Sequence, residues 1–150
     1  MKVRDIMTPD PITIGPQHTV GEAAKLFMDK KIDGMPVTDD SGRLIGLFTK
    51  SHVYRVINGD GNLERTVGEM MTTDLLTGRA DDEFGAVVGP FVPRLPVVDE
   101  DGLVVGILTR GDIAKAFFNS YNNISLELDT IINSAYNLIV SVDAAGTIKV

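Results

Sequence analysis

The sequence predicts an α+β fold in which two similar repeats are followed by a C-terminal helix and strands. Short β-branched or apolar runs alternate with segments whose apolar residues recur at helical spacing, which is typical of mixed strands and helices. Three blocks of sequence also occur twice in the same order, the first displaced by 64 positions and the other two by 60. The chain of 150 residues, 43% of them hydrophobic, is long enough to bury one core. We therefore expect one globular region built from a duplicated unit.

The recurring blocks suggest where each repeat begins and ends. They pair residues 5–8 with 69–72, residues 35–37 with 95–97, and residues 44–50 with 104–110. The predicted division assigns 1–62 to the first repeat, 63–120 to the second, and 121–150 to a linker helix and the start of a following domain.

Each repeat is predicted to follow the order β-α-β-β-α. In the first helix of the first repeat, apolar residues share one face, Thr19 is a predicted N-cap, and Glu22 completes a capping box. An acidic, glycine-containing turn joins the next two apolar runs and indicates a hairpin. The predicted elements are strands at Pro11–Ile14, Met35–Val37 and Leu44–Thr49, and helices at Val20–Met28 and Ser51–Ile57.

The second repeat keeps the hairpin, over Leu95–Leu108, and the last helix, over Gly111–Phe118. Its first helix is weakened by glycine and proline, because proline inside a helix costs about 3 kcal/mol. We expect at most one or two turns between Glu83 and Val88. The weakening residues are Gly85, Gly89, Pro90 and Pro93.

The tail lies outside the repeats and contains a further pattern. Apolar residues such as Leu128 and Ile131 mark one face of a helix over about Ser125–Tyr136. Strands are predicted at Leu138–Val142 and at residues 147–150, joined by the turn 143–146. Because the second strand would be unfinished at the last residue, we expect the sequence to be part of a longer protein.

Composition narrows the class of protein. The 14 basic and 21 acidic residues give a net charge of −7, which argues against an unspecific nucleic-acid binder. With no cysteine, no apolar run of membrane-spanning length and no secretory signal, the chain is expected to be soluble and cytoplasmic. Because no catalytic or metal-binding motif is recognisable, we predict neither an enzyme nor a metal site.

The duplicated blocks make the chain resemble a tandem pair of CBS domains, the cystathionine-β-synthase module. The matching features are the Asp-x-Met-Thr opener, the apolar-Pro-Val strand, the Asp-rich turn, and Gly-x-x-Thr-x-x-Asp before the last helix. This resemblance implies that the repeats pack as a pseudo-two-fold pair with two clefts between them. It also implies a homodimer and a regulatory ligand: AMP, ADP, ATP or S-adenosylmethionine.

The resemblance implies one complete ligand site. Asp112 would bind the ribose hydroxyls, Thr109 would lie near the phosphate, and Arg94 and Arg110 would contact it. The adenine would lie against the other repeat. Asp112 has an alternative role, in which it stabilises the start of a helix without any ligand. The predicted nucleotide-binding residues are Ile12, Thr13, Ile32, Asp33, Gly34, Pro36, Arg94, Thr109, Arg110 and Asp112.

The second site implied by the resemblance is degenerate. Where the family pattern has a ribose carboxylate, this chain has His52, and a neutral imidazole cannot accept from both ribose hydroxyls. Nucleotide binding is therefore not expected there. The residues of this degenerate site are Leu76, Thr77, Pro93, Thr49 and His52.

The tail is similar to the beginning of a PAS sensor domain, in which a helix leads into a strand, an Asp-x-x-Gly turn and another strand. A decayed third repeat is the alternative. The leading hypothesis is a regulatory module that passes an adenosyl signal to an output domain of a larger protein, such as a bacterial signalling protein or transcription regulator. The rival hypothesis is a dimerisation scaffold that binds no ligand.

Overall fold

The structure, a computed structural model, describes residues 1–87 and 94–144. The chain is divided into two compact units. The first is formed by residues 1–112, and the second begins at Ile113. Among the described helices, none has the length and apolar character needed to cross a bilayer.

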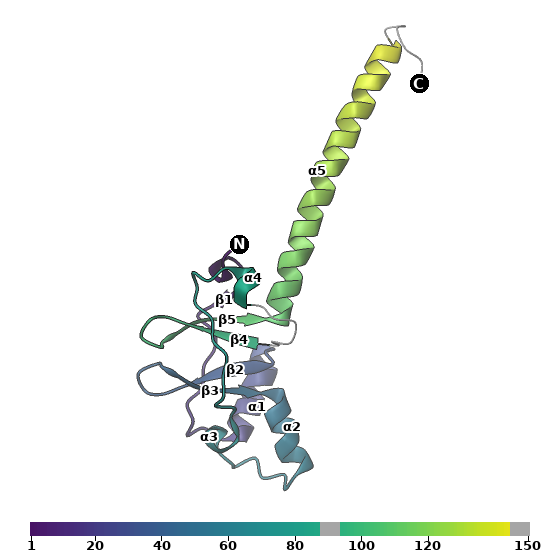
Figure 1. Cartoon of the computed structure of the whole chain (residues 1–150). Coiled ribbons are helices and arrows are strands. Elements are labelled where there is room, and N and C mark those ends of the chain that lie inside the picture. The colour runs from purple at the N-terminus through teal and green to yellow at the C-terminus, as the bar shows by residue number, and fades with distance from the viewer. Residues whose placement is uncertain (88–93, 145–150) are drawn as a thin grey trace. The chain divides into compact units, whose positions relative to one another are not determined.

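The first unit is a mixed α+β structure that contains the hairpins of both repeats (Figure 1). The predicted hairpins and their flanking helices are confirmed. The elements are a 3-10 helix at Val3–Asp5, β1 Thr8–Pro9, α1 Val20–Lys30, β2 Gly34–Thr38, β3 Leu44–Thr49, α2 Lys50–Asn58, α3 Val67–Met70, α4 Phe84–Val87, β4 Arg94–Val98, β5 Val104–Thr109, and α5, which starts at Arg110 and ends at Ala144.

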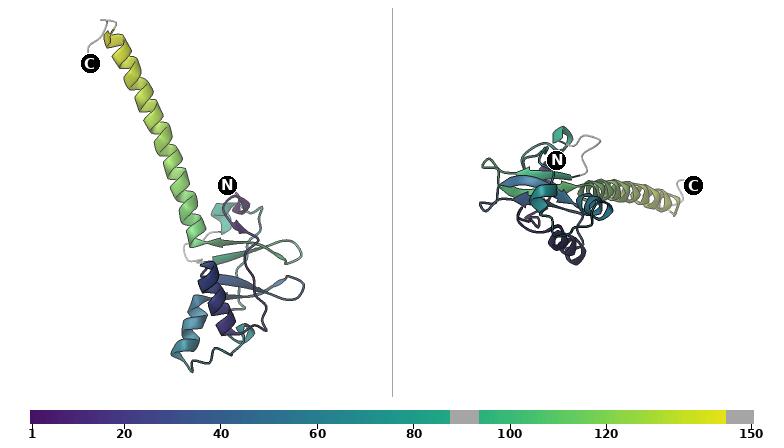
Figure 2. Two further views of the ribbon diagram at one scale, coloured as in Figure 1. Left: turned by 180° about the vertical axis from the view of Figure 1, so that it is seen from behind. Right: turned by 90° about the horizontal axis from the view of Figure 1, so that it is seen from below.

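The two hairpins have the same register, displaced by 60 residues. Gly34 pairs with Thr49 in β2–β3, and Arg94 pairs with Thr109 in β4–β5. Each turn contains a glycine with positive φ, Gly42 at 86° and Gly102 at 81°. The turns lie side by side at one end of the unit (Figure 2), and their backbones exchange two hydrogen bonds, of 3.0 and 3.2 Å.

The segment that opens each repeat crosses to the hairpin of the other repeat. Thr8 in β1 pairs with Ile107 of β5, so the sheet order is β1-β5-β4. In the same way, Thr72 exchanges two backbone hydrogen bonds with Leu47 of β3, at 2.9 and 3.0 Å. Neither sheet is therefore completed by its own repeat.

Glycine makes room for this exchange. A Cβ atom at Gly106 would lie 2.5 Å from Sδ of Met7, and a Cβ atom at Gly46 would meet Sδ of Met71 even more closely. Met7 and Met71 therefore lie in space that a side chain at Gly106 or Gly46 would occupy.

The core of the first repeat combines its own helices and strands with a residue from the second. The apolar face of α1 buries Val20, Ala23 and Phe27, and the hydroxyl of Thr19 accepts the amide of Glu22 as the predicted N-cap. Val67 of α3, from the second repeat, lies fully buried in the same cluster. The two repeats therefore share a core as well as their sheets.

The predicted strand at Pro11–Ile14 is wrong apart from one residue. Only Ile14 forms a bridge, with Val37, while the preceding three residues are irregular. Proline at position 11 has no amide proton to contribute to a ladder. In the second repeat, α4 is a single short turn of helix, as expected; Val88, Gly89, Pro90 and Pro93 lie outside the described residues.

The tail differs most from prediction. The helices predicted at Gly111–Phe118 and Ser125–Tyr136 are parts of one continuous helix, α5. The predicted strand at Leu138–Val142 is wrong, because these residues continue α5, as do the first two residues of the predicted turn. No glycine or proline interrupts the sequence between Gly111 and Gly146, and a helix satisfies its backbone groups locally, whereas a strand needs a partner. The strand predicted at 147–150 lies outside the described residues.

The shared core generates a test of the exchange. We expect Val67→Ala to lower the free energy of unfolding by about 2 kcal/mol, because two buried methyl groups are removed from the core of the other repeat. Urea unfolding followed by far-UV circular dichroism measures this change. The control is Leu76→Ala, because Leu76 is exposed in the segment between α3 and α4. This substitution should change the free energy of unfolding by less than about 0.5 kcal/mol. Equal effects of the two substitutions would contradict the shared core.

Candidate functional site

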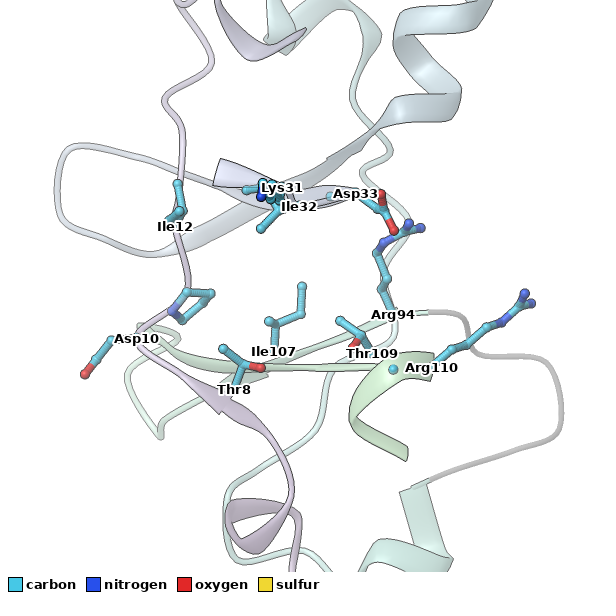
Figure 3. Close-up of a pocket in the computed structure, with 13 residues that line it drawn as sticks. Thr8, Asp10, Ile12, Lys31, Ile32, Asp33, Arg94, Ile107, Thr109 and Arg110 are labelled. Atoms are coloured by element: carbon cyan, nitrogen blue, oxygen red, sulfur yellow. The ribbon is translucent and has the colours of Figure 1, made fainter. Parts of the chain in front are cut away.

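A cavity of about 560 Å³ opens between the two repeats inside the first unit (Figure 3). The second repeat contributes the end of β5, the start of α5 and the first residue of β4, and the first repeat contributes the segment between α1 and β2 and the chain after β1. The lining residues are Thr8, Asp10, Pro11, Ile12, Lys31, Ile32, Asp33, Gly34, Arg94, Ile107, Thr109, Arg110 and Gly111.

Apolar side chains line the middle of this cavity. Ile32 comes from the loop before β2, and Ile107 of β5 points toward it from the opposite wall (Figure 3). Ile12, after β1, adds a third apolar side chain. This arrangement can hold a flat, apolar group between the repeats.

One end of the cavity is rich in positive charge. Arg94 and Arg110 lie at this end with the carboxylate of Asp33, whereas Lys31 lies beside Ile32 and Asp10 lies on the opposite side of the cavity (Figure 3). Since α5 starts here, the positive end of its dipole adds to the attraction for an anion. Among the described residues, no group of three or more His, Asp or Glu side chains could hold a metal ion.

Arg94 reaches this position because glycine lies opposite. A Cβ atom on Gly34 would lie 2.8 Å from both Cδ and Nε of Arg94. The guanidinium points toward Asp33 (Figure 3), whose carboxylate is paired with Nζ of Lys50 at 3.2 Å. Any larger residue at position 34 would force the side chain of Arg94 to shift.

Asp112 directly follows the lining residue Gly111 and fixes two threonines that line the cavity. Its Oδ2 accepts the backbone amide and the hydroxyl of Thr109, each at 3.0 Å, and its Oδ1 accepts the hydroxyl of Thr8 at 3.0 Å. The amide of Asp112 in turn donates to Oγ1 of Thr109 at 3.2 Å. The carboxylate therefore caps α5 and ties it to the exchanged opener of the first repeat.

His52 occupies the equivalent position in the first repeat. Its Nδ1 accepts the amide of Thr49 at 3.0 Å, and its Nε2 lies 3.0 Å from the hydroxyl of Thr72. Because Nδ1 accepts, we assign the proton to Nε2, which donates to Thr72. The ring is only 6% exposed and stacks on Phe48 at 5.2 Å between ring centroids. Both nitrogens are thus used within the protein.

Seven of the ten residues predicted for the first site line the cavity. The other three do not: Thr13 lines a different hollow, Pro36 is fully buried, and Asp112 follows the lining residue Gly111 and is hydrogen-bonded to Thr8 and Thr109. The seven are Ile12, Ile32, Asp33, Gly34, Arg94, Thr109 and Arg110.

Six lining residues are not among those predicted from the sequence. The alternation of side chains along β5 puts Ile107 on the same face as Thr109, so this residue could have been found from the pattern. Thr8 reaches the cavity through the exchange of openers, which the sequence pattern does not reveal. The missed residues are Thr8, Asp10, Pro11, Lys31, Ile107 and Gly111.

The residues predicted for the degenerate site have different surroundings. Thr49 and His52 are buried, whereas Leu76 and Thr77 are exposed. Pro93 lies outside the described residues. The side chain that the family resemblance would place on a ribose is committed instead to capping α2 and binding Thr72.

The sequence is similar to a known domain family and to known proteins. The CBS domain matches residues 3–59 and 67–119. Inosine-5'-monophosphate dehydrogenase of Methanocaldococcus jannaschii is 31% identical over 118 residues, which are 76% of this chain and 23% of that enzyme. The chain therefore spans about a quarter of the length of this relative.

Solved structures are similar over most of the chain. The CBS domain pair of protein MJ0100, in complex with 5'-methylthioadenosine and S-adenosyl-L-methionine, is 29% identical with a TM-score of 0.74, over 80% of this chain and 98% of that one. CBSX2 of Arabidopsis thaliana has been solved in complex with AMP. It is 30% identical with a TM-score of 0.70, over 80% of this chain and 98% of that one.

The buried histidine predicts a loss of stability in acid. Burial, with the positive charge of Arg55, lowers the pKa of His52 below its ordinary value of 6.5. As the pH falls below about 6.5, His52 becomes protonated in the unfolded chain but stays neutral in the folded protein, so acid favours unfolding. We expect the free energy of unfolding to fall by up to about 1.4 kcal/mol per pH unit in this range.

Urea unfolding between pH 7.5 and 5 measures this slope. In His52→Asn, which keeps an acceptor for the amide of Thr49 but does not titrate, the slope should flatten. The control, His18→Gln, removes a histidine whose side chain is 44% exposed, and the slope should persist in this variant. A slope that survives in His52→Asn would contradict the assignment.

Proposed function

The chain belongs to the CBS domain family, and we propose that its paired repeats form a regulatory module that binds an adenosyl ligand. The observation that carries this proposal is the cavity between the repeats, where three isoleucines lie next to a cationic helix start. Its volume of about 560 Å³ is typical of small-molecule sites.

The adenine ring would lie among the isoleucines. Ile32 and Ile107 face each other across the cavity, and Ile12 stands beside them. A flat heterocycle buries both faces well in such a slot. The ligands of two similar proteins, AMP in CBSX2 and S-adenosylmethionine with methylthioadenosine in MJ0100, share this ring.

A phosphate would lie at the cationic end. Arg94 and Arg110 supply guanidinium groups, which suit phosphate geometry, and Gly111 lets an anion approach the first amides of α5. S-adenosylmethionine carries a positive sulfonium where these cations gather. We therefore favour a phosphate-bearing ligand, such as AMP.

Asp112 would meet the ribose. Its carboxylate has about four acceptor positions, and Thr8 and Thr109 use three of them. One position remains for a ribose hydroxyl. His52 has no equivalent capacity, so we propose one nucleotide per chain.

The signal would leave through α5. Thr109, Arg110 and Gly111 line the cavity and lead directly into this helix. A ligand that favours one arrangement of the repeats would shift α5 only if its affinity differs between the arrangements. We propose that an output domain in a longer protein receives this change.

A dimerisation scaffold without ligand is the second candidate. It is favoured by the first repeat, where the position of the ribose-binding carboxylate is already occupied by a histidine whose nitrogens are both used. Its sharpest difference from the sensor is thermodynamic, because a scaffold gains no stability from nucleotides.

Thermal unfolding with AMP, ADP, ATP or S-adenosylmethionine tests the proposal. At about 100 times Kd, a ligand should stabilise the fold by about 2.7 kcal/mol, which raises Tm by roughly 5 to 10 °C for a chain of this size. Arg94→Gln should weaken AMP binding at least about tenfold, since a charge-assisted hydrogen bond is lost. Isothermal titration calorimetry measures both affinities.

Two controls belong to this experiment. Arg55→Gln removes an exposed arginine on α2 and should bind AMP like the unmodified chain. His52→Asn should also leave the affinity unchanged. If no adenosyl compound raises Tm, the scaffold replaces the sensor as the best description.

A further inference from the structure

Helix α5 carries an apolar pattern with alternating spacings of three and four residues. This pattern has a mean period of 3.5, the heptad period of helices that supercoil around each other. The residues of this heptad stripe are Ala114, Phe117, Tyr121, Ile124, Leu128, Ile131, Ala135, Leu138 and Val142.

The described part of the stripe is exposed. Tyr121, Leu128 and Ile131 have 70%, 54% and 64% of their surface accessible, and Phe117 has 63%. Phe118 and Ile132 extend the same face and are exposed to a similar degree. Apolar patches of this extent on a protein surface usually mark an interaction site.

Charged residues avoid the stripe. Between Ile113 and Ala144 the sequence has four of them, Lys115, Glu127, Asp129 and Asp143, and none falls on a stripe position. A partner must therefore offer an apolar surface, and another helix with the same period can follow the stripe along its whole length.

We infer that the heptad stripe is covered by α5 of a second copy of this chain. A second copy supplies a stripe of equal length and period, as a self-complementary interface requires. Six exposed side chains that bury on the order of 100 Å² each would remove about 1,200 Å² from water in the pair, the lower limit for a specific interface. A long helix also gains most of its stability from such packing. The inference does not rest on the ligand proposal.

The absence of cysteine makes the test direct, because one introduced thiol reports on one position. At a protein concentration of tens of micromolar, Leu128→Cys on the stripe should form a disulfide-linked dimer at least tenfold faster than Asn133→Cys. Asn133 is the control because it is exposed on the opposite face of α5. Mild oxidation followed by non-reducing electrophoresis measures both rates. Equal rates would overturn the inference.

A second pair of variants separates α5 from every other contact surface. In the Leu128→Cys background, Ile131→Asp should abolish cross-linking, because a charge would be buried between the helices. Asn133→Asp is the matched control and should leave cross-linking intact, while far-UV circular dichroism checks folding. Cross-linking that persists in Ile131→Asp, or an unmodified chain that sediments as a monomer at this concentration, would show that a second copy does not cover the stripe.

Discussion

The exchange of opening segments between the repeats is the interaction on which the first unit depends. Thr8 adds a strand to the hairpin of the second repeat, and Thr72 bridges to the hairpin of the first. Each threonine hydroxyl also binds the side chain that caps the helix following that hairpin, Asp112 or His52. An isolated two-stranded hairpin is only marginally stable, so each repeat completes its sheet and its cap with residues of the other. The cavity lies on this seam, which explains why both repeats line it.

The same network has taken two chemical forms. At Asp112 it is built on a carboxylate, which caps α5 and keeps acceptor capacity for a further group. At His52 it is built on a neutral imidazole, whose nitrogens are both used and whose ring stacks on Phe48. A second asymmetry lies in the equivalent positions 34 and 94, where a glycine on one side makes room for an arginine on the other. These differences leave the two repeats chemically unequal, although their hairpins share one register.

Helix α5 illustrates how context overrides local preference. The β-branched run near Val142 favours a strand by composition, yet the residues are helical because the helix satisfies its own backbone without a neighbouring strand. The apolar heptad spacing that begins at Ala114 continues through these residues to Val142. The composition of residues 138–142 alone therefore predicts the wrong structure, a strand, whereas the apolar period over four heptads agrees with the observed helix.

The sequence by itself determined the repeats, the hairpins and their turns, the cap at Thr19 and most residues of the cavity wall, because these depend on local spacing and on a recognisable family pattern. Only the tertiary structure decided that Thr8 enters the cavity, that Asp112 binds Thr8 and that His52 is buried. Each of these depends on a contact between segments distant along the chain, Thr8 with β5 or Thr72 with α2. No local pattern of apolar and polar residues encodes which segment pairs with which hairpin.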